Sequence, residues 1–456
     1  MNKGLGNPPP GANLAALRDH NAALVLGLLR DAGAAGASRA ELAGRTGLTP
    51  QAVSKICARL RAAGLAAEAG RRASTGGKPA TTWRLVPDAA HAIGLHLDRD
   101  ALTATLVDLT GTPVATRTAP LAFGAGAEAL LDAVAKEVAA LLADAEGCAA
   151  GGPTAGTSPS AVRGTAAASP SGAPGSRALA ADAREGSSAA AGELAAGGAA
   201  HAVPSSPRAS GTAHRPLLGV GVAVPGPLDH ASGVLHRVTG FPEWDGFPLR
   251  DALAERLGMP VVVDKDTNAA ALGLVLRGAG GGAPAADSFA YLHLGTGLGA
   301  GLVLGGGVHR GARTGAGEFG HQVLQLDGPP CPCGNRGCIE ALCLDAVAAG
   351  GTARAARLLG VGAANLVRLL DIDLVLLGGR TVLAEPEPYL RGVRAVLTED
   401  AGRADGRTVP VAVTPGGGRT VVEGAAELAL APLFGRSGTA FTTRSDETKI
   451  VTSGGM

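Results

Sequence analysis

Hydrophobic residues near the start of the chain recur with the period of an α-helix. In the segment "NAALVLGLLRDAG", Leu24, Val25, Leu28 and Leu29 fall on one stripe, which is typical of an amphipathic helix. A similar pattern continues through residues 38–65, where polar residues and glycines interrupt it. The first 65 residues are therefore predicted to form three helices.

Polar residues mark the ends of the second and third predicted helices. Ser38, with Glu41 three residues later, forms a capping box that opens the second helix, and Gly47 ends it and supplies the turn. Thr49 followed by Pro50 is an N-cap with proline at the first helical position. This order of signals predicts a helix-turn-helix.

The outward face of the third helix is polar and basic. Its side chains suit contacts with bases and phosphates in a major groove of DNA. The predicted contact residues are Gln51, Ser54, Lys55 and Arg59.

A hairpin is predicted after this helix, and its tip is also basic. Arg71, Arg72 and Lys78 surround the tip and are expected to form a wing against phosphate or the minor groove. Residues 1–88 hold 12 Lys and Arg against 5 Asp and Glu, a net charge of +7 in a chain whose total is +1. Residues 14–88 are predicted to be a winged helix-turn-helix that binds double-stranded DNA. The alternative is a basic three-helix domain with no nucleic-acid role, or one used for protein contact.

The rest of the chain alternates between strand and helix patterns, which predicts an α/β body. Residues 90–146 and 216–435 are expected to form one domain, because the strand "LLGVGVAV" continues the apolar pattern that "AIGLHL" begins. Residues 147–215 are nearly all Ala, Gly, Ser, Pro and Thr, so they are predicted to be a disordered insertion, and 436–456 a disordered tail. Without a long apolar run or a secretory signal, the protein is expected to be cytoplasmic with no membrane span.

Three of the chain's six cysteines lie within the segment "CPCGNRGCIE". Thiolates are preferred ligands of Zn²⁺, so Cys331, Cys333 and Cys338 are predicted to bind a metal. The alternatives are free buried cysteines or a redox cluster. The remaining cysteines, Cys57, Cys148 and Cys343, are interpreted as ordinary small residues.

Five segments of the body resemble the ROK family of repressors, open reading frames and kinases, a branch of the actin-like ATPase fold. They are "GVAVPGPLD", "WDGFPL", "DKDTNAAALG", "LGTGLGAGLVLGGGVHRGARTGAGEFGH" and "CPCGNRGCIE". The resemblance runs from about Ala90 to Gly435 without the insertion and implies a two-lobed domain. With a winged helix in front, the chain is similar to the family's sugar-responsive repressors, such as those for xylose and N-acetylglucosamine.

The resemblance also implies which residues form the site. His321 corresponds to the fourth ligand of a closed, structural Zn²⁺ site, and its other ring nitrogen would meet a sugar hydroxyl. Asp266, Glu318 and Glu340 correspond to the family's hydroxyl-binding carboxylates, although both glutamates have the alternative of being solvated loop charges. Asp266 also matches the catalytic base of the kinases, which is expected to be vestigial here.

The first phosphate loop departs from the pattern of the active kinases, which is Asp-X-Gly-Gly-Thr-Lys or similar. Here His96 occupies the position of the Asp in this pattern. Asp98 and Arg99 occupy the positions of the two glycines, and Asp100 occupies that of the Thr. Carboxylates repel phosphate, and the lost glycines block close approach of the backbone. ATP is therefore predicted not to bind, and the protein is predicted not to be an enzyme.

Two further departures concern the sugar site and the second lobe. Lys265 replaces the Asn that usually precedes the catalytic base; it is interpreted as a surface lysine, with pairing to a phosphate or acid group as the alternative. The segment between Glu340 and Gly378 is shorter than the family normally has.

The predicted function is that of a DNA-binding transcriptional regulator, and repression is favoured over activation. Its sensor would bind a sugar without phosphorylating it, and it would act as a homodimer or homotetramer on operator DNA. One rival is an ATP-dependent sugar kinase with an appended DNA-binding head. Another is a ligand-independent DNA binder whose sensor has decayed.

Overall fold

The computed structural model describes residues 14–72, 80–150, 216–238, 240–277, 286–403 and 406–435. The predicted insertion and tail lie outside these ranges, except that a helix expected to end at 146 continues to Ala150. Within the described ranges, every helix is too short or too polar to span a lipid bilayer.

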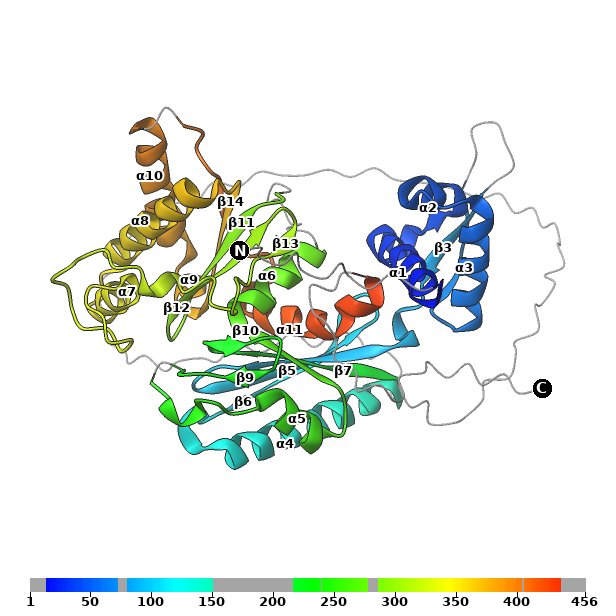
Figure 1. The fold of residues 1–456 in the computed structure, drawn as a ribbon, viewed down its shortest axis with the longest axis horizontal. Helices are drawn as coiled ribbons and strands as arrows, with labels where there is room; N and C mark the ends of the chain where they lie inside the picture. The colour runs from blue at the N-terminus through cyan, green and yellow to red at the C-terminus, as the bar shows by residue number, and fades with distance from the viewer. Residues whose placement is uncertain are drawn as a thin grey trace, which may run out of the picture. The chain divides into compact units, whose positions relative to one another are not determined.

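The first described residues form a small domain of three helices and a three-stranded antiparallel sheet, called the head below (Figure 1). The sheet order is β1-β3-β2. The elements are α1 (Leu14–Ala32), β1 (Ala37–Ser38), α2 (Arg39–Thr46), α3 (Pro50–Ala62), β2 (Ala66–Arg72) and β3 (Ala80–Leu85). This is the predicted winged helix-turn-helix fold.

The predicted helix ends of the head are confirmed. The Glu41 amide donates to the Ser38 hydroxyl at 3.2 Å, and the Ser38 amide donates to the Glu41 carboxylate at 2.7 Å. Gly47 ends α2 with a left-handed backbone (φ 69°). The Ala52 amide donates to the Thr49 hydroxyl at 3.2 Å and so caps α3. Because these caps are local in sequence, the chain could specify them without any long-range contact.

The body consists of two lobes built on similar five-stranded sheets. The first has the order β10-β7-β4-β5-β6, with β4, β5 and β6 antiparallel and β7 and β10 parallel to β4. Helices α4 and α5 pack on one face of it (Figure 1). The lobe comprises β4 (His91–Leu97), β5 (Ala101–Asp108), β6 (Pro113–Pro120), α4 (Ala127–Ala150), β7 (Leu217–Val224), β8 (Leu228–Asp229), β9 (Val234–Leu235), α5 (Leu249–Leu257) and β10 (Val261–Lys265).

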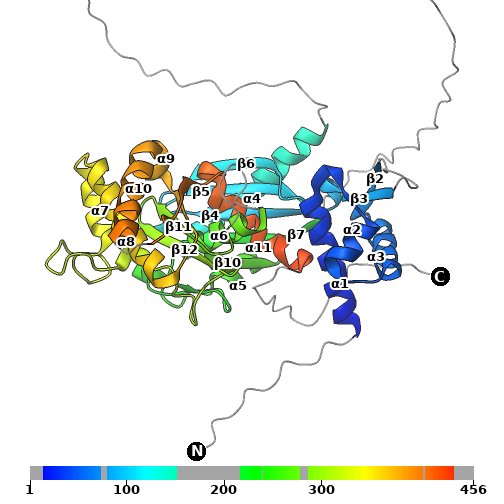
Figure 2. The ribbon, with the colours of Figure 1, turned by 90° about the horizontal axis from the view of Figure 1, so that it is seen from above.

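The second sheet repeats this arrangement with the order β13-β12-β11-β14-β15. Strands β11, β12 and β13 are antiparallel, and β14 and β15 run parallel to β11. Helices α7, α8 and α10 pack on one face (Figure 2). The strands are β11 (Phe289–Leu294), β12 (Leu298–Leu304), β13 (Gly307–Val308), β14 (Leu374–Gly378) and β15 (Val411–Val413), and the helices α7 (Ile339–Ala348), α8 (Thr352–Leu370), α9 (Arg380–Ala384) and α10 (Pro386–Arg403).

Two central helices, α6 (Asp266–Arg277) and α11 (Thr420–Leu430), cover the remaining faces of the two sheets. Every residue of α11 is buried. Glycines allow close packing here: a Cβ atom on Gly221 of β7 would lie 1.8 Å from the Ala425 carbonyl oxygen of α11. The two helices therefore pack closely against both sheets. Helix α6 begins with the candidate site residue Asp266.

The head and the body share a hydrophobic core. Val25 and Leu29 of α1 are fully buried in the same cluster as Leu430 of α11 and the nearby Phe434. Arg30 at the end of α1 forms an ion pair with Glu427 of α11, and both side chains are at least 94% buried. The head is thus packed directly on a central helix of the body.

We predict that Gly424→Ala strongly destabilises the body. A methyl group at this position of α11 would lie 2.0 Å from the carbonyl oxygen of Ala269 in α6, so the two helices would have to separate. Overpacking of this kind costs about 1–3 kcal/mol or more in free energy of unfolding, which urea denaturation measures.

The control is Gly418→Ala, whose added Cβ meets no atom within 4 Å. Its free energy of unfolding should stay within about 0.5 kcal/mol of the parent. Equal stability of the two variants would show that α6 and α11 are less tightly packed than described.

Candidate functional site

A pocket lies where strand ends of the two sheets meet. It is lined by the β4–β5 turn, the residues after β7, the start of α6, the β11–β12 turn and the segment that leads to α7. Its ionisable lining residues are Asp98, Arg99, Lys265, Asp266, His293, Glu318, His321 and Glu340. All four residues for which the resemblance implies sugar binding are therefore brought together.

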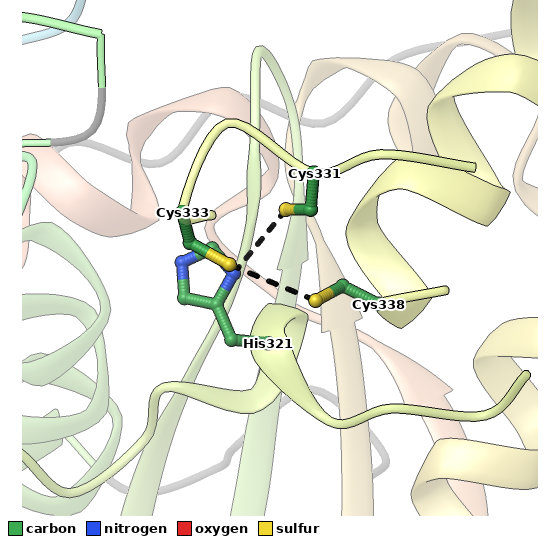
Figure 3. Close-up of side chains that lie close together, drawn as sticks. All are labelled: His321, Cys331, Cys333 and Cys338. Atoms are coloured by element: carbon green, nitrogen blue, oxygen red, sulfur yellow. Dashed lines mark hydrogen bonds between the residues drawn. The ribbon is translucent and has the colours of Figure 1, made fainter. Parts of the chain in front are cut away.

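The predicted metal ligands form one cluster beside this pocket (Figure 3). The ligand atoms of His321, Cys331, Cys333 and Cys338 all lie within 4.8 Å of one another. The Nδ1 atom of His321 is 3.7 Å from the Cys331 sulfur, and the sulfurs of Cys333 and Cys338 are also 3.7 Å apart. Three thiols and an imidazole at this spacing suit tetrahedral Zn²⁺.

The chemistry of the thiols also fits a metal site. Burial and the two neighbouring thiols raise the pKa of Cys338 to about 12, so without a cation this group stays protonated at neutral pH. Zinc binds thiolates, and it would displace those protons. Because Nδ1 of His321 faces the sulfurs, the opposite ring nitrogen remains for the pocket that His321 also lines.

The carboxylates of the pocket are held by backbone amides. Asp266 begins α6 and accepts a hydrogen bond of 2.6 Å from the Thr267 amide. Glu340, in the first turn of α7, is buried and accepts one of 2.8 Å from the Leu298 amide. Glu340 is therefore not a solvated loop charge, whereas the Glu318 side chain is 42% exposed.

The interpretation of Lys265 as a surface residue is wrong. Its side chain is only 3% exposed. The ammonium group donates to the Ala316 carbonyl at 2.5 Å and to the Glu318 carboxylate at 2.9 Å. Lys265 ends β10, an edge strand whose residues are mostly buried, and sequence alone does not reveal that its side chain lines the pocket.

Side chains of the β4–β5 turn, Asp98 and Asp100, contact the second lobe. The Thr296 hydroxyl, in the β11–β12 turn, donates to Asp98 at 3.0 Å. Arg380, at the start of α9, pairs with Asp100 at 2.8 Å. Burial tends to raise the pKa of Asp98, but the Arg99 amide, nearby His96 and the Thr296 hydroxyl outweigh it and lower this pKa. Asp98 is thus an anion bonded across the two lobes.

The predicted DNA-contacting residues of the third helix lie on α3. Gln51, Lys55 and Arg59 are exposed, and Ser54 is half-buried with its hydroxyl bonded to the Pro50 carbonyl. Arg71 and Arg72 end β2, whereas Lys78 lies outside the described residues. The wing contacts therefore stay a prediction.

Several residues of the site were missed from the sequence. Thr296 lies in the glycine-rich segment 295–301 and His293 precedes it, and nothing in this pattern singles out either side chain. Arg380 follows Gly378 and Gly379. No local pattern signals its partner Asp100, which is 280 residues away in the chain.

Comparisons with known proteins agree with this geometry. The model of the ROK family matches residues 208–348, which include the pocket's central segments and the cysteine cluster. This segment of the chain therefore belongs to the ROK family. The relatives that match part of the chain include both glucokinases and xylose repressors.

A glucokinase of Halalkalibacterium halodurans is 41% identical over 125 residues, or 27% of this chain and 37% of that protein. A xylose repressor of Caldicellulosiruptor bescii is 36% identical over 124 residues, or 27% of this chain and 30% of that protein. The chain thus spans less than half the length of either relative.

The structure of a ROK family transcriptional regulator, a homologue of the E. coli MLC protein, resembles the whole described fold. The two share a TM-score of 0.62 at 18% identity, over 92% of this chain and 98% of the other. At this identity the likeness establishes the fold, including the winged helix, and nothing finer.

We predict that Cys333→Ser removes the metal. Cys333 is the exposed member of the cluster, so its replacement should leave the fold intact while it removes one of four ligands. Metal content, measured by mass spectrometry of the purified protein, should fall from about one zinc per chain to well below that value.

The matched control is Cys57→Ala, a buried cysteine in the head that lies outside the cluster. It should retain the full metal content. A Cys333→Ser variant with undiminished zinc would remove Cys333 from the ligand set.

Proposed function

We propose that this protein is a DNA-binding transcriptional regulator, a repressor by preference, whose kinase-like body senses a sugar without phosphorylating it. Asp266, Glu318, His321 and Glu340 would bind the sugar hydroxyls. A structural Zn²⁺ held by His321 and the three cysteines would fix the orientation of the His321 ring. The protein is expected to work in the cytoplasm.

The observation that carries the proposal is the basic recognition helix. A helix-turn-helix with intact caps leaves Gln51, Lys55 and Arg59 of α3 exposed. A helix of this kind enters a major groove, where lysine and arginine meet phosphates and glutamine meets adenine. Pairing of two copies would place two such helices on the half-sites of an operator.

The pocket supports a sugar ligand. Carboxylates that each keep an acceptor oxygen can accept hydrogen bonds from adjacent hydroxyl groups, and an imidazole can donate to another. Asp266 and Glu340 are pinned by backbone amides at 2.6 and 2.8 Å, so their geometry is set before the ligand arrives. Such preorganisation reduces the entropy that binding costs.

Two observations favour a sensor over a kinase. Asp98 and Asp100 bring carboxylates to the loop where a kinase would hold phosphate, and each is bonded to the second lobe, through Thr296 and Arg380. Burial also lowers the pKa of His96, so this residue is neutral at physiological pH and cannot replace a carboxylate in organising Mg²⁺. Phosphoryl transfer depends on positioning and charge stabilisation, and the carboxylates and the neutral imidazole of this segment favour neither.

The junction between head and body provides a route for regulation. Helix α11 packs against α6, whose first residue is Asp266, and carries Glu427, which pairs with Arg30 of the head. A ligand that shifts the lobes would move α11 and with it the head. The free energy of DNA binding would change by no more than the difference between the ligand's binding free energies for the two placements of the head.

We predict that Lys55→Gln weakens DNA binding through loss of a phosphate contact. An operator selected from random DNA with the purified protein provides the probe. The slope of log affinity against log salt should fall by about 0.9, and affinity should fall on all sequences alike.

Lys136→Gln is the matched control, because Lys136 is an exposed lysine on α4 of the body. It should leave the slope and the affinity unchanged. If random DNA yields no selected sequence, or if both variants behave alike, the head does not act as proposed.

Two further assays test the rival functions: a phosphorylation assay, and measurement of operator affinity and thermal stability with sugars present. Protein incubated with ATP and a panel of hexoses should release no ADP above the level of a sample without sugar. Measurable phosphorylation would favour the kinase. Operator affinity and thermal stability that stay constant across the whole panel would favour a DNA binder with a decayed sensor.

A further inference from the structure

The charged groups of the pocket are unequally satisfied. Each of its carboxylates accepts a hydrogen bond from the protein: Asp98 from Thr296, Asp266 from the Thr267 amide, Glu318 from Lys265 and Glu340 from the Leu298 amide. A satisfied carboxylate attracts a cation less strongly than a free one. The pocket therefore attracts a cationic ligand less strongly than its number of carboxylates implies.

Lys265 strengthens this effect. Its ammonium group is buried and lies 2.9 Å from Glu318, so it neutralises one carboxylate within the pocket wall. Two of its three N–H donors are used, by Ala316 and Glu318. The third remains, and an ammonium group can only donate. At this position the pocket is suited to an acceptor on the ligand.

Arg99 is the cation that remains unpaired. It lines the pocket from the β4–β5 turn, and its guanidinium lies 5.8 Å from the centre of the Phe241 ring. Within the described part of the chain, no carboxylate or carbonyl forms an ion pair or hydrogen bond with this guanidinium. Its neighbour Asp98 bonds to the Arg99 backbone amide instead.

The guanidinium lies beside the β11–β12 turn. A Cβ atom added to the pocket residue Gly297 would lie 3.6 Å from Nη2 of Arg99. Guanidinium groups bind carboxylates and phosphates through two parallel hydrogen bonds. An arginine with free donors in a sugar pocket is therefore suited to a ligand that carries such an anion.

We infer that the ligand is an anionic sugar, bearing a carboxylate or a phosphate group, and that Arg99 binds the anion. The inference rests on the proposed sugar-sensing function and narrows its ligand class. Arg99 would be the residue that determines specificity for charge, while Asp266, Glu340 and His321 hold the hydroxyls.

Calorimetric titration of the full-length protein tests the inference with matched ligands. Glucose, galactose and mannose are each compared with their hexuronates and their 6-phosphates, and inorganic phosphate probes the anion alone. The best anionic sugar should bind about 10-fold more tightly than its neutral parent. The uronate and phosphate arms show which anion the pocket takes.

Arg99→Gln should abolish this preference, so that anionic and neutral sugars bind about equally while affinity for the neutral parent is kept. Arg237→Gln, at an arginine 88% exposed and outside the pocket, should retain it. Equal binding of neutral and anionic sugars by the parent protein, or an equal loss of both in Arg99→Gln, would overturn the inference and leave the sensor function standing. Absence of binding by every sugar in the panel would overturn both.

Discussion

The burial of α11 is the constraint on which the rest of the structure depends. All eleven residues of this helix are inaccessible, yet it carries two glutamates, and a buried charge is tolerated only when it is paired. Glu423 is paired by Arg277, which ends α6, and by Arg419; Glu427 is paired by Arg30 of the head. The Arg277 and Arg30 pairs fix α11 against α6, which begins at the pocket, and against α1 of the head. The same ion pairs that make its burial possible therefore also connect the two ends of the proposed signal.

Local signals in the sequence were enough to predict the head. The Ser38–Glu41 box and the Thr49-Pro50 cap act over three residues, so their geometry follows from the residue types alone. The grouping of the three cysteines was also predictable, because close spacing in sequence forces closeness in space, whereas His321 was assigned through the resemblance. The body's fold was recognised through resemblance, since its strands read only as short apolar runs that periodicity cannot assign to lobes.

Contacts between distant parts of the chain could not be predicted. Lys265 looked like a surface lysine because a charged residue is rarely buried without a partner, and its partner Glu318 lies 53 residues away. Arg30 and Glu427, 397 residues apart, gave no signal at all. The bonds from Asp98 and Asp100 to the second lobe were equally hidden, although the departure from the kinase pattern was visible. Sequence showed that the phosphate loop was altered, whereas only the structure shows what the altered residues now contact.

In the proposed sensor, those contacts would affect how the lobes close. In a kinase of this fold, the nucleotide would supply charge between the phosphate loop and the second lobe. Here Asp98 and Asp100 reach Thr296 and Arg380 directly, so the protein provides both partners itself. The Asp100–Arg380 pair is half exposed and contributes little energy, whereas Asp98 is partly buried and bonded to a hydroxyl and an amide. If the proposed sensor function holds, closure would depend on the ligand beside Asp266 and not on a nucleotide.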